Sequence, residues 1–473
     1  MKIQELPFLT MGQTAKLVRK KAVSPEELVR AYLRRIEAVD GKLHSYITVC
    51  SDEAMNAARQ AQKDIAGGIY RGPLHGVPIA VKDQMCTKGI RTTSGSKIFK
   101  DYIPDEDATV IRKLKDAGAI LLGKLNLSEF AVGGTRVHPY GTPRNPWNLE
   151  CNPGESSSGS GIAVSASLCA AALGEDTGGS IRWPAAWCGV VGLRPTSGRV
   201  SRYGIAPLCW SMDTAGPMTR TVEDCALLLQ AIAGYDPRDG TSLQVPVPDY
   251  ASRLSGDLKG MRLGYVREYL NGEVNDKDVQ EAVEKAIETF GELGAQVEEV
   301  SIPLLSLATP IFLCTADVDF AHVLEDILRT RAQDVDSHTR TRCFAALLIP
   351  PYLYHRGQRA RRLLRDQILG ALCRVNALIS PTGPKPPQKI SSLIQRPTSK
   401  EDVLRVMFRS RSYMSAYALA ALPAISIPCG FTASNLPIGL QIAGRPFEEA
   451  TVLRVASAFE SATEYHLRRP PLD

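Results

Sequence analysis

The first 70 residues place apolar and polar positions at helical spacing. Within residues 11–40 the apolar side chains fall near every third or fourth position. Ser24-Pro25-Glu26-Glu27 has the form of an N-cap followed by proline at the first helical position. Residues 51–66 are also predicted to be helical. We therefore expect an N-terminal helical segment over residues 1–70.

Further along, short apolar runs alternate with helical stretches. Residues 77–81 are predicted to form a short buried strand that ends at Lys82, and a helix over 107–118 precedes a strand over 119–122. The alternation resumes over 261–302. It closes with strands near 377–380, 424–428 and 438–443 and a helix over 448–462. This order is typical of an α/β protein whose sheet is covered by helices on both faces.

Two segments are predicted to be loops. Residues 235–260 are rich in Asp, Gly, Pro and Ser, and residues 381–400 contain five prolines. Neither resembles a flexible linker between domains, because the helix-strand pattern continues on both sides. We therefore expect one large domain over residues 1–473.

Composition narrows the class of protein. The 473 residues are 44% hydrophobic and 22% charged, which is ordinary for a globular protein with a large core. A net charge of +6 is mild and does not require nucleic acid. The 11 cysteines form no CxxC pair or Cys/His cluster, so we expect no metal site. We see neither a signal peptide nor a stretch long enough to span a bilayer, and we expect a cytoplasmic protein with reduced thiols.

The strongest chemical signal is a run of small residues around Ser180. Gly178 and Gly179 stand directly before it, so the backbone can turn tightly with its N–H groups converging on one point. An oxyanion needs such a point, and a serine at its apex suits acyl transfer. None of the seven histidines lies near Ser180 in the sequence, and GxSxG is absent. The other available base is Lys82, where apolar surroundings favour a neutral amine.

Three other patterns carry less weight. Glycine-rich runs can bind phosphate, but GxxxxGK[ST] and GxGxxG are absent. Residues 94–97 match SxxK without the SDN and KTG motifs that accompany it in penicillin-recognising enzymes. The basic stretch 355–365 could contact nucleic acid, although a solvated helix face explains it better.

Several segments together resemble the amidase signature family, in an order that spans nearly the whole chain. The matching segments are GVPIAVKD (76–83), KLNLSEFA (124–131), GESSSGS (154–160), GEDTGGSIR (174–182), GVVGLRPT (189–196), LPAISIP (422–428) and LPIGLQ (436–441). The resemblance implies a single large domain with a central mixed, twisted sheet covered by helices on both faces. It places a variable region over 235–420 and implies no metal or organic cofactor.

The resemblance also implies a catalytic triad. Lys82 matches the family's base, Ser180 the nucleophile, and Ser156 the bridging serine that relays a proton between them. In the family this bridging serine follows a cis peptide bond.

The binding groups carry over in the same way. The backbone N–H groups of Thr177, Gly178, Gly179 and Ser180 match the oxyanion hole. The loop after Phe130, formed by Ala131, Val132 and Gly133, matches the wall of the acyl pocket.

Two residues depart from the family pattern. Glu155 and Ser158 stand where the family has glycine. A glutamate at positive φ would be strained, and a carboxylate near Lys82 would favour its charged form. The triad geometry at this loop therefore stays open at the sequence level.

We expect a free-standing amidase that acts on a small-molecule amide, and possible further substrates are esters, anilides and carbamates. It would be a monomer or homodimer without a nucleic-acid or membrane partner. The alternative is the glutaminase subunit of a tRNA-dependent amidotransferase, whose catalytic residues would be the same. We favour the first because the region that clamps the substrate in that subunit is short and proline-rich here.

Overall fold

The computed structural model describes residues 2–135, 137–270, 275–393 and 412–472. Within these ranges eleven strands form one mixed sheet in the order β1-β3-β2-β4-β6-β5-β10-β11-β9-β7-β8. The strands are β1 Tyr46–Val49, β2 Pro78–Lys82, β3 Ile120–Leu125, β4 Ala171–Glu175, β5 Val191–Arg194, β6 Ala215–Thr219, β7 Arg262–Val266, β8 Gln296–Val300, β9 Ala377–Pro381, β10 Ala424–Phe431 and β11 Pro437–Ala443.

Strand direction decides where chemistry can gather. β2 runs parallel to both β3 and β4, and Val81 is in register with Leu173. The carboxyl ends of β2 and β4 therefore meet at one edge of the sheet, where loops carry functional groups in such folds. β2 ends at Lys82 and β4 ends at Glu175.

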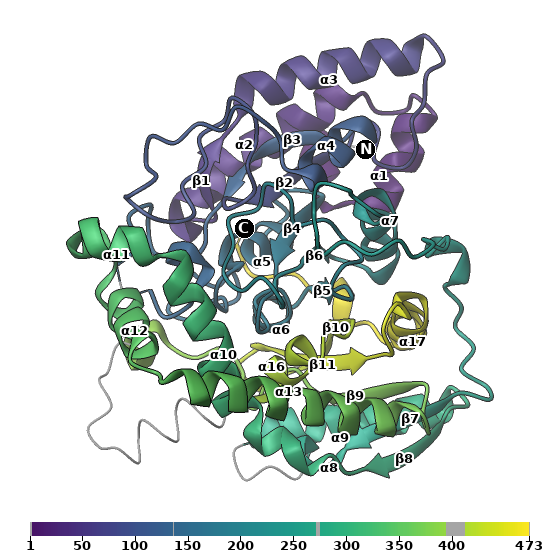
Figure 1. The fold of residues 1–473 in the computed structure, drawn as a ribbon. Helices are drawn as coiled ribbons and strands as arrows, with labels where there is room; N and C mark the ends of the chain where they lie inside the picture. Colours follow the sequence, from purple (N-terminus) through teal and green to yellow (C-terminus); the bar gives the residue numbers. More distant parts are fainter. Residues whose placement is uncertain (1, 136, 271–274, 394–411, 473) are drawn as a thin grey trace.

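Helices flank the sheet on both faces, which confirms the predicted α/β class (Figure 1). They are α1 Met11–Arg19, α2 Pro25–Leu43, α3 Ser51–Ala66, α4 Thr109–Asp116, α5 Ser158–Ser165, α6 Arg182–Cys188, α7 Val222–Ile232, α8 Arg267–Leu270, α9 Lys277–Glu292, α10 Ala308–Val323, α11 Glu325–Arg331, α12 Ser337–Leu347, α13 Pro351–Leu372, α14 Ile390–Leu393, α16 Ser412–Leu419 and α17 Glu449–Ala462. The larger apolar cluster joins the sheet to α1–α3, α5–α7, α9 and α17, and a second lies under α10, α12, α13 and α16.

The expected N-terminal helix over 11–40 is two helices. α1 ends at Arg19, and α2 begins at Pro25 with Ser24 Oγ accepting the Glu27 N–H at 3.1 Å. The capping side chain sets a new helix axis at this point. The predicted helix over 51–66 coincides with α3, and the predicted loop 235–260 holds only a short 3₁₀ turn, Ala251–Arg253.

The predicted loop over 381–400 is partly regular. β9 ends at Pro381 and α14 occupies Ile390–Leu393, while residues 394–400 lie outside the described ranges.

One described segment is long and apolar enough to cross a bilayer, contrary to the expectation from the sequence. It is Pro303–Val323, which comprises a 3₁₀ turn and α10. More than half of its apolar window is buried inside the protein, where α10 packs against α12, α13 and α16. Its apolar composition is therefore that of a core helix.

Gly216 provides a test of the central sheet. A Cβ added there would lie 2.1 Å from the backbone oxygen of Leu193, whereas a Cβ at Gly41 in α2 would meet nothing within 4 Å. We expect Gly216→Ala to lower the free energy of unfolding by about 1–3 kcal/mol or more, because backbone cannot yield as a side chain does. Gly41→Ala should raise it by about 0.5–1 kcal/mol. Urea denaturation checks both, and equal effects would contradict the packing described here.

Candidate active site

Lys82 and Ser156 lie in direct contact in a dry interior. The Lys82 amine is 2.6 Å from Ser156 Oγ, and both residues are almost completely inaccessible to solvent. Burial lowers the pKa of the Lys82 amine from its ordinary value, and the nearby Glu175 carboxylate opposes that shift. The site thus provides the two conditions for a lysine base, which are desolvation and a hydroxyl at hydrogen-bonding distance.

The backbone at Ser156 differs from the expected form. Every peptide bond among the described residues is trans, so the cis bond expected before Ser156 is absent. Ser156 instead has a φ of 66°, between Gly154 at 93° and the start of α5. The left-handed turn brings the hydroxyl to Lys82 without a cis bond.

Glu155 does not bring its charge to Lys82. Its φ is not positive, since the left-handed positions are Gly154 and Ser156 on either side. Its carboxylate points to the loop at Gly133, where an added Cβ would lie 2.4 Å from Glu155 Oε2. The strain and the opposing charge considered for this residue are therefore both absent.

Ser180 lies beside the serine-rich loop. Its backbone carbonyl accepts the N–H of Ser157 at 3.2 Å, which joins the turn before α6 to the residue after Ser156. Ser180 is partly accessible, whereas Lys82 and Ser156 are buried. This is the order that a relay needs, with the nucleophile facing the pocket and the base behind it.

Glu175 is the charged partner of Lys82, and sequence reasoning missed it. Glu175 Oε2 lies 3.3 Å from the Lys82 amine, and the Glu175 carbonyl is also 3.3 Å away. Asp83, the acid adjacent in sequence, points to the other side of the strand and pairs with Lys124 at 3.2 Å. A charged residue at the end of the apolar run before the Ser180 turn was the available signal.

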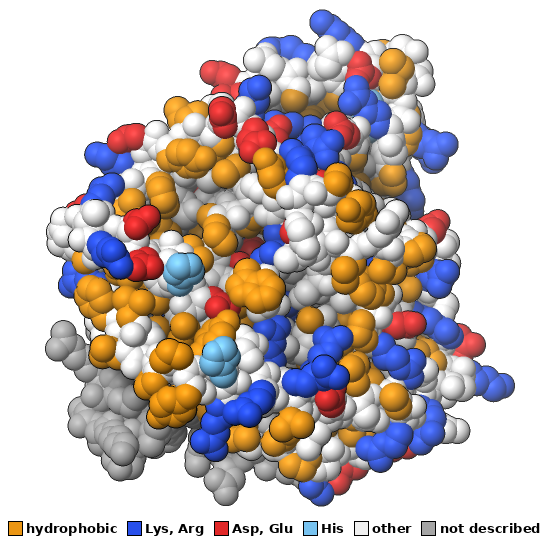
Figure 2. Space-filling model, in the orientation of Figure 1, with side chains coloured by type: hydrophobic (Ala, Val, Ile, Leu, Met, Phe, Trp, Pro, Cys, Tyr) orange, Lys and Arg blue, Asp and Glu red, His pale blue; other side chains and the backbone are white. Residues whose placement is uncertain are grey.

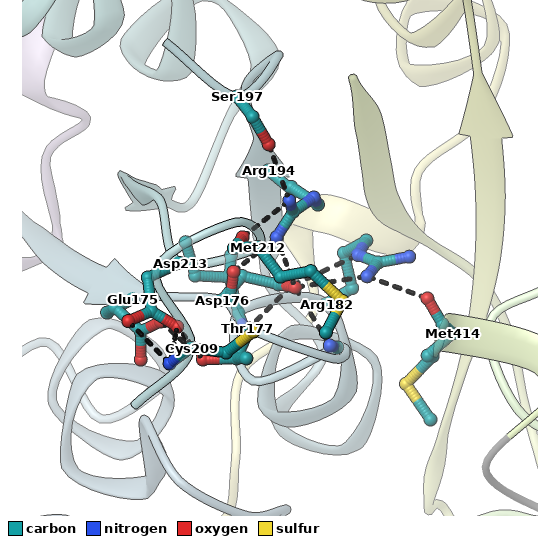
Figure 3. A network of polar contacts seen from close by, with 12 residues as sticks. Glu175, Asp176, Thr177, Arg182, Arg194, Ser197, Cys209, Met212, Asp213 and Met414 are labelled. Atoms are coloured by element: carbon teal, nitrogen blue, oxygen red, sulfur yellow. Dashed lines mark hydrogen bonds and ion pairs between the residues drawn. The ribbon is translucent and has the colours of Figure 1, made fainter. Parts of the chain in front are cut away.

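Asp176 holds the turn that carries Ser180. Its carboxylate accepts from Arg182 at 3.1 Å and from Arg194 at 3.1 Å, with all three side chains fully buried, and Figure 3 shows both guanidinium groups converging on it. Burial opposes ionisation, but the two arginines more than offset it, so the pKa of Asp176 lies well below its usual range. Arg182 continues to the Met414 carbonyl at 2.9 Å and to Gln441 at 2.6 Å.

The glycine turn is covered by side chains that only glycine permits. A Cβ at Gly178 would lie 2.6 Å from Phe312, and a Cβ at Gly179 would lie 2.6 Å from Met414. The N–H of Gly179 donates to Asp176 Oδ1 at 2.8 Å. This amide is therefore already used within the loop, which removes Gly179 from the expected set of oxyanion donors. The remaining expected donors are the N–H groups of Thr177, Gly178 and Ser180.

The expected pocket loop lies against the catalytic loop. Ala131 has a φ of 61° and Gly133 a φ of 80°, so the chain coils tightly here. The Val132 carbonyl accepts from Arg342 at 2.7 Å, and Arg342 pairs with Asp317 of α10. Together with Glu155 these groups place charge beside the expected pocket.

The weaker sequence patterns have structural explanations. Lys97 of the SxxK match is exposed, and no cluster of metal-ligating side chains occurs among the described residues. In the basic stretch, Arg361 donates to the Leu419 carbonyl and Arg362 pairs with Asp366, as on a solvated helix face. Figure 2 shows Lys and Arg side chains spread among hydrophobic and acidic ones on the face in view.

Comparisons with known proteins agree with this architecture. The Amidase family model matches residues 27–453. A glutamyl-tRNA(Gln) amidotransferase subunit of Geobacter metallireducens is 44% identical over 494 aligned residues, which cover 98% of this chain and 99% of that protein. The peptide amidase of Stenotrophomonas maltophilia has a similar structure, with a TM-score of 0.84 at 32% identity, covering 98% of each chain. The corresponding glutamyl-tRNA(Gln) amidotransferase subunit of Thermotoga maritima gives 0.83 at 32% identity, covering 99% of this chain and 98% of that one.

Asp176→Asn tests the support of the turn. Removing the carboxylate charge leaves two buried guanidinium groups without a counterion, so we expect the free energy of unfolding to fall by about 3–5 kcal/mol. Asp366→Asn is the matched control because the Arg362–Asp366 pair is exposed, and it should change stability by no more than about 0.5 kcal/mol. Chemical denaturation measures both. A similar small change in each variant would show that Asp176 does not carry the turn.

Proposed function

The chain belongs to the amidase signature family, and from that premise we propose that it hydrolyses a carboxamide through a Ser180 acyl-enzyme, as the glutamine-cleaving subunit of an amidotransferase. Membership makes it an enzyme acting on C–N bonds. The observation that carries the proposed chemistry is the 2.6 Å contact between a fully buried lysine amine and Ser156, beside the turn that bears Ser180.

The proposed reaction begins with neutral Lys82. Ser180 attacks the amide carbonyl while its proton passes through Ser156 to the Lys82 amine. The oxyanion accepts hydrogen bonds from the backbone of the glycine turn. The relay then protonates the leaving nitrogen, and water hydrolyses the ester on Ser180.

The relatives support the amidotransferase assignment over the free-standing one. The glutamyl-tRNA(Gln) amidotransferase subunits of Geobacter metallireducens and Moorella thermoacetica match at 44% and 42% identity, over 98–99% of this chain. The charged side chains at the pocket loop, Arg342, Asp317 and Glu155, suit a polar amide such as glutamine. The similarity to a peptide amidase keeps a free-standing amidase as the second candidate.

Ser180 and Lys82 are the residues to test first. We expect Ser180→Ala to reduce kcat by about 10⁴-fold or more, and Lys82→Ala nearly as much, with both proteins folded. The exposed Lys97 serves as control, and Lys97→Ala should keep full activity. Since Lys82 works as a base only when uncharged, kcat/KM should rise with pH as the amine loses its proton. Burial places that rise below the ordinary lysine pKa.

Retained activity of Lys82→Ala at neutral pH would exclude the base. Labelling by phenylmethanesulfonyl fluoride, mapped by mass spectrometry, should fall on Ser180. Labelling of Cys86 or Cys188 instead would indicate a thiol enzyme.

Ammonia release from glutamine and from a peptide C-terminal amide separates the two candidates. We expect the purified chain to cleave glutamine with the higher kcat/KM, with Ser180→Ala as the blank for spontaneous deamidation. A higher value for the peptide amide, without cleavage of glutamine, would overturn the amidotransferase assignment and support a free-standing amidase.

A further inference from the structure

Amide hydrolysis leaves a proton on the enzyme whenever ammonia departs uncharged. The balance is RCONH₂ + H₂O → RCOO⁻ + NH₃ + H⁺, since the carboxylic acid ionises at neutral pH. On the proposed function, on which this inference rests, Lys82 is the group that holds that proton. It must lose the proton before it can serve as a base again.

A continuous chain of polar groups leads away from Lys82 on the side opposite Ser156. The Lys82 amine contacts Glu175 Oε2 at 3.3 Å. Glu175 Oε1 contacts the Thr177 hydroxyl at 2.8 Å, and the same hydroxyl contacts Asp213 Oδ1 at 2.7 Å. Figure 3 shows Glu175, Thr177 and Asp213 gathered in one group.

The geometry requires a second proton in this group. The Thr177 hydroxyl has one hydrogen but lies within hydrogen-bonding distance of two carboxylate oxygens. Only one contact can use that hydrogen, so the other needs a proton on a carboxyl group. Asp213 is the better holder: burial, reinforced by the charge of Glu175, raises its pKa to about 7.

The other charges around the group are accounted for. Asp176 faces Lys82 but is neutralised by Arg182 and Arg194. The Cys209 thiol lies beside Asp213, and burial raises its pKa, so it stays protonated. Asp213 also accepts the backbone N–H groups of Leu208 and Cys209. Glu175 and Asp213 are thus the acids that can exchange a proton here.

The far end of the chain reaches the surface. Glu175 and Asp213 both line a cleft of about 580 Å³, whose wall also includes Arg202, Arg238 and Asp239. Asp213 is 5% exposed and Glu175 is 1% exposed, so Asp213 is the end nearer to solvent.

We propose that Glu175, Thr177 and Asp213 form a proton route that returns Lys82 to its neutral form after each turnover. Asp213 releases its proton to water in the cleft. The Thr177 hydroxyl then donates to Asp213 and accepts the proton that Glu175 has taken from Lys82. One proton enters at Lys82 and one leaves at Asp213, and every group ends as it began.

Thr177→Val tests the route, because valine keeps the shape of threonine and removes the hydroxyl. Two rates are compared: steady-state ammonia release, with whichever of glutamine and the peptide amide the wild type cleaves, and labelling of Ser180 by phenylmethanesulfonyl fluoride. Labelling needs one proton transfer to Lys82 and no reset. We expect kcat to fall at least about 10-fold while the labelling rate stays within about 3-fold. Thr177→Ser, which retains the hydroxyl, should restore kcat.

Unchanged kcat in Thr177→Val would overturn the route, and so would an equal loss of both rates, which indicates a structural role. Asp213→Asn gives an independent test, with the same expected split between turnover and labelling. Glu175→Gln removes the charge that favours the ammonium form, so the pH profile of labelling should move to lower pH; an unmoved profile counts against Glu175. If wild-type Ser180 is not labelled at all, the proposed function fails rather than the route.

Discussion

The site depends on keeping one buried amine uncharged among three acids. Lys82 is fully buried, and Glu175, Asp176 and Asp213 all act on it. Unopposed, three carboxylates would hold the ammonium form and abolish its use as a base. Two arginines neutralise Asp176, and burial keeps Asp213 protonated until about pH 7. Glu175 is then the one full charge left against desolvation, at a distance from which it can exchange a proton with the amine.

The sheet determines which groups can meet. β2 and β4 are parallel neighbours, so their last residues reach the same edge, and alternation along β2 sends Asp83 to Lys124 on the opposite side. β4 pairs with β6 in antiparallel fashion, with Glu175 opposite Ala215. That pairing brings the loop before β6, and with it Asp213, back to the end of β4. The two arginines lie on α6 and β5, which flank the same turn.

The sequence predicted the fold class and the contact between Lys82 and Ser156, because apolar periodicity and the motifs around both residues are local signals. It did not predict Glu175 or Asp213 as neighbours of the amine, since their proximity arises from strand pairing between residues 38 positions apart (213 − 175). The trans backbone at Ser156 was also beyond reach, because a left-handed turn and a cis bond can each deliver the hydroxyl. The break within residues 11–40 was readable, since Ser24 and Pro25 mark it. Whether Ser180 is the nucleophile stays a prediction.

The same catalytic core can serve both a free-standing amidase and one subunit of an amidotransferase, because reaction and selectivity reside in different elements. Lys82, Ser156 and the glycine turn sit on strand ends and short helices of the central sheet, where burial leaves little freedom. The expected pocket wall is a tightly coiled loop, Ala131–Gly133, held by Arg342 of α12 and, through it, Asp317 of α10. A change of substrate therefore requires changes in that loop and in these two helices, not in the strand ends. Arg342 fixes the Val132 carbonyl and carries the charge nearest to it, so the position and the polarity of the wall are set by one side chain.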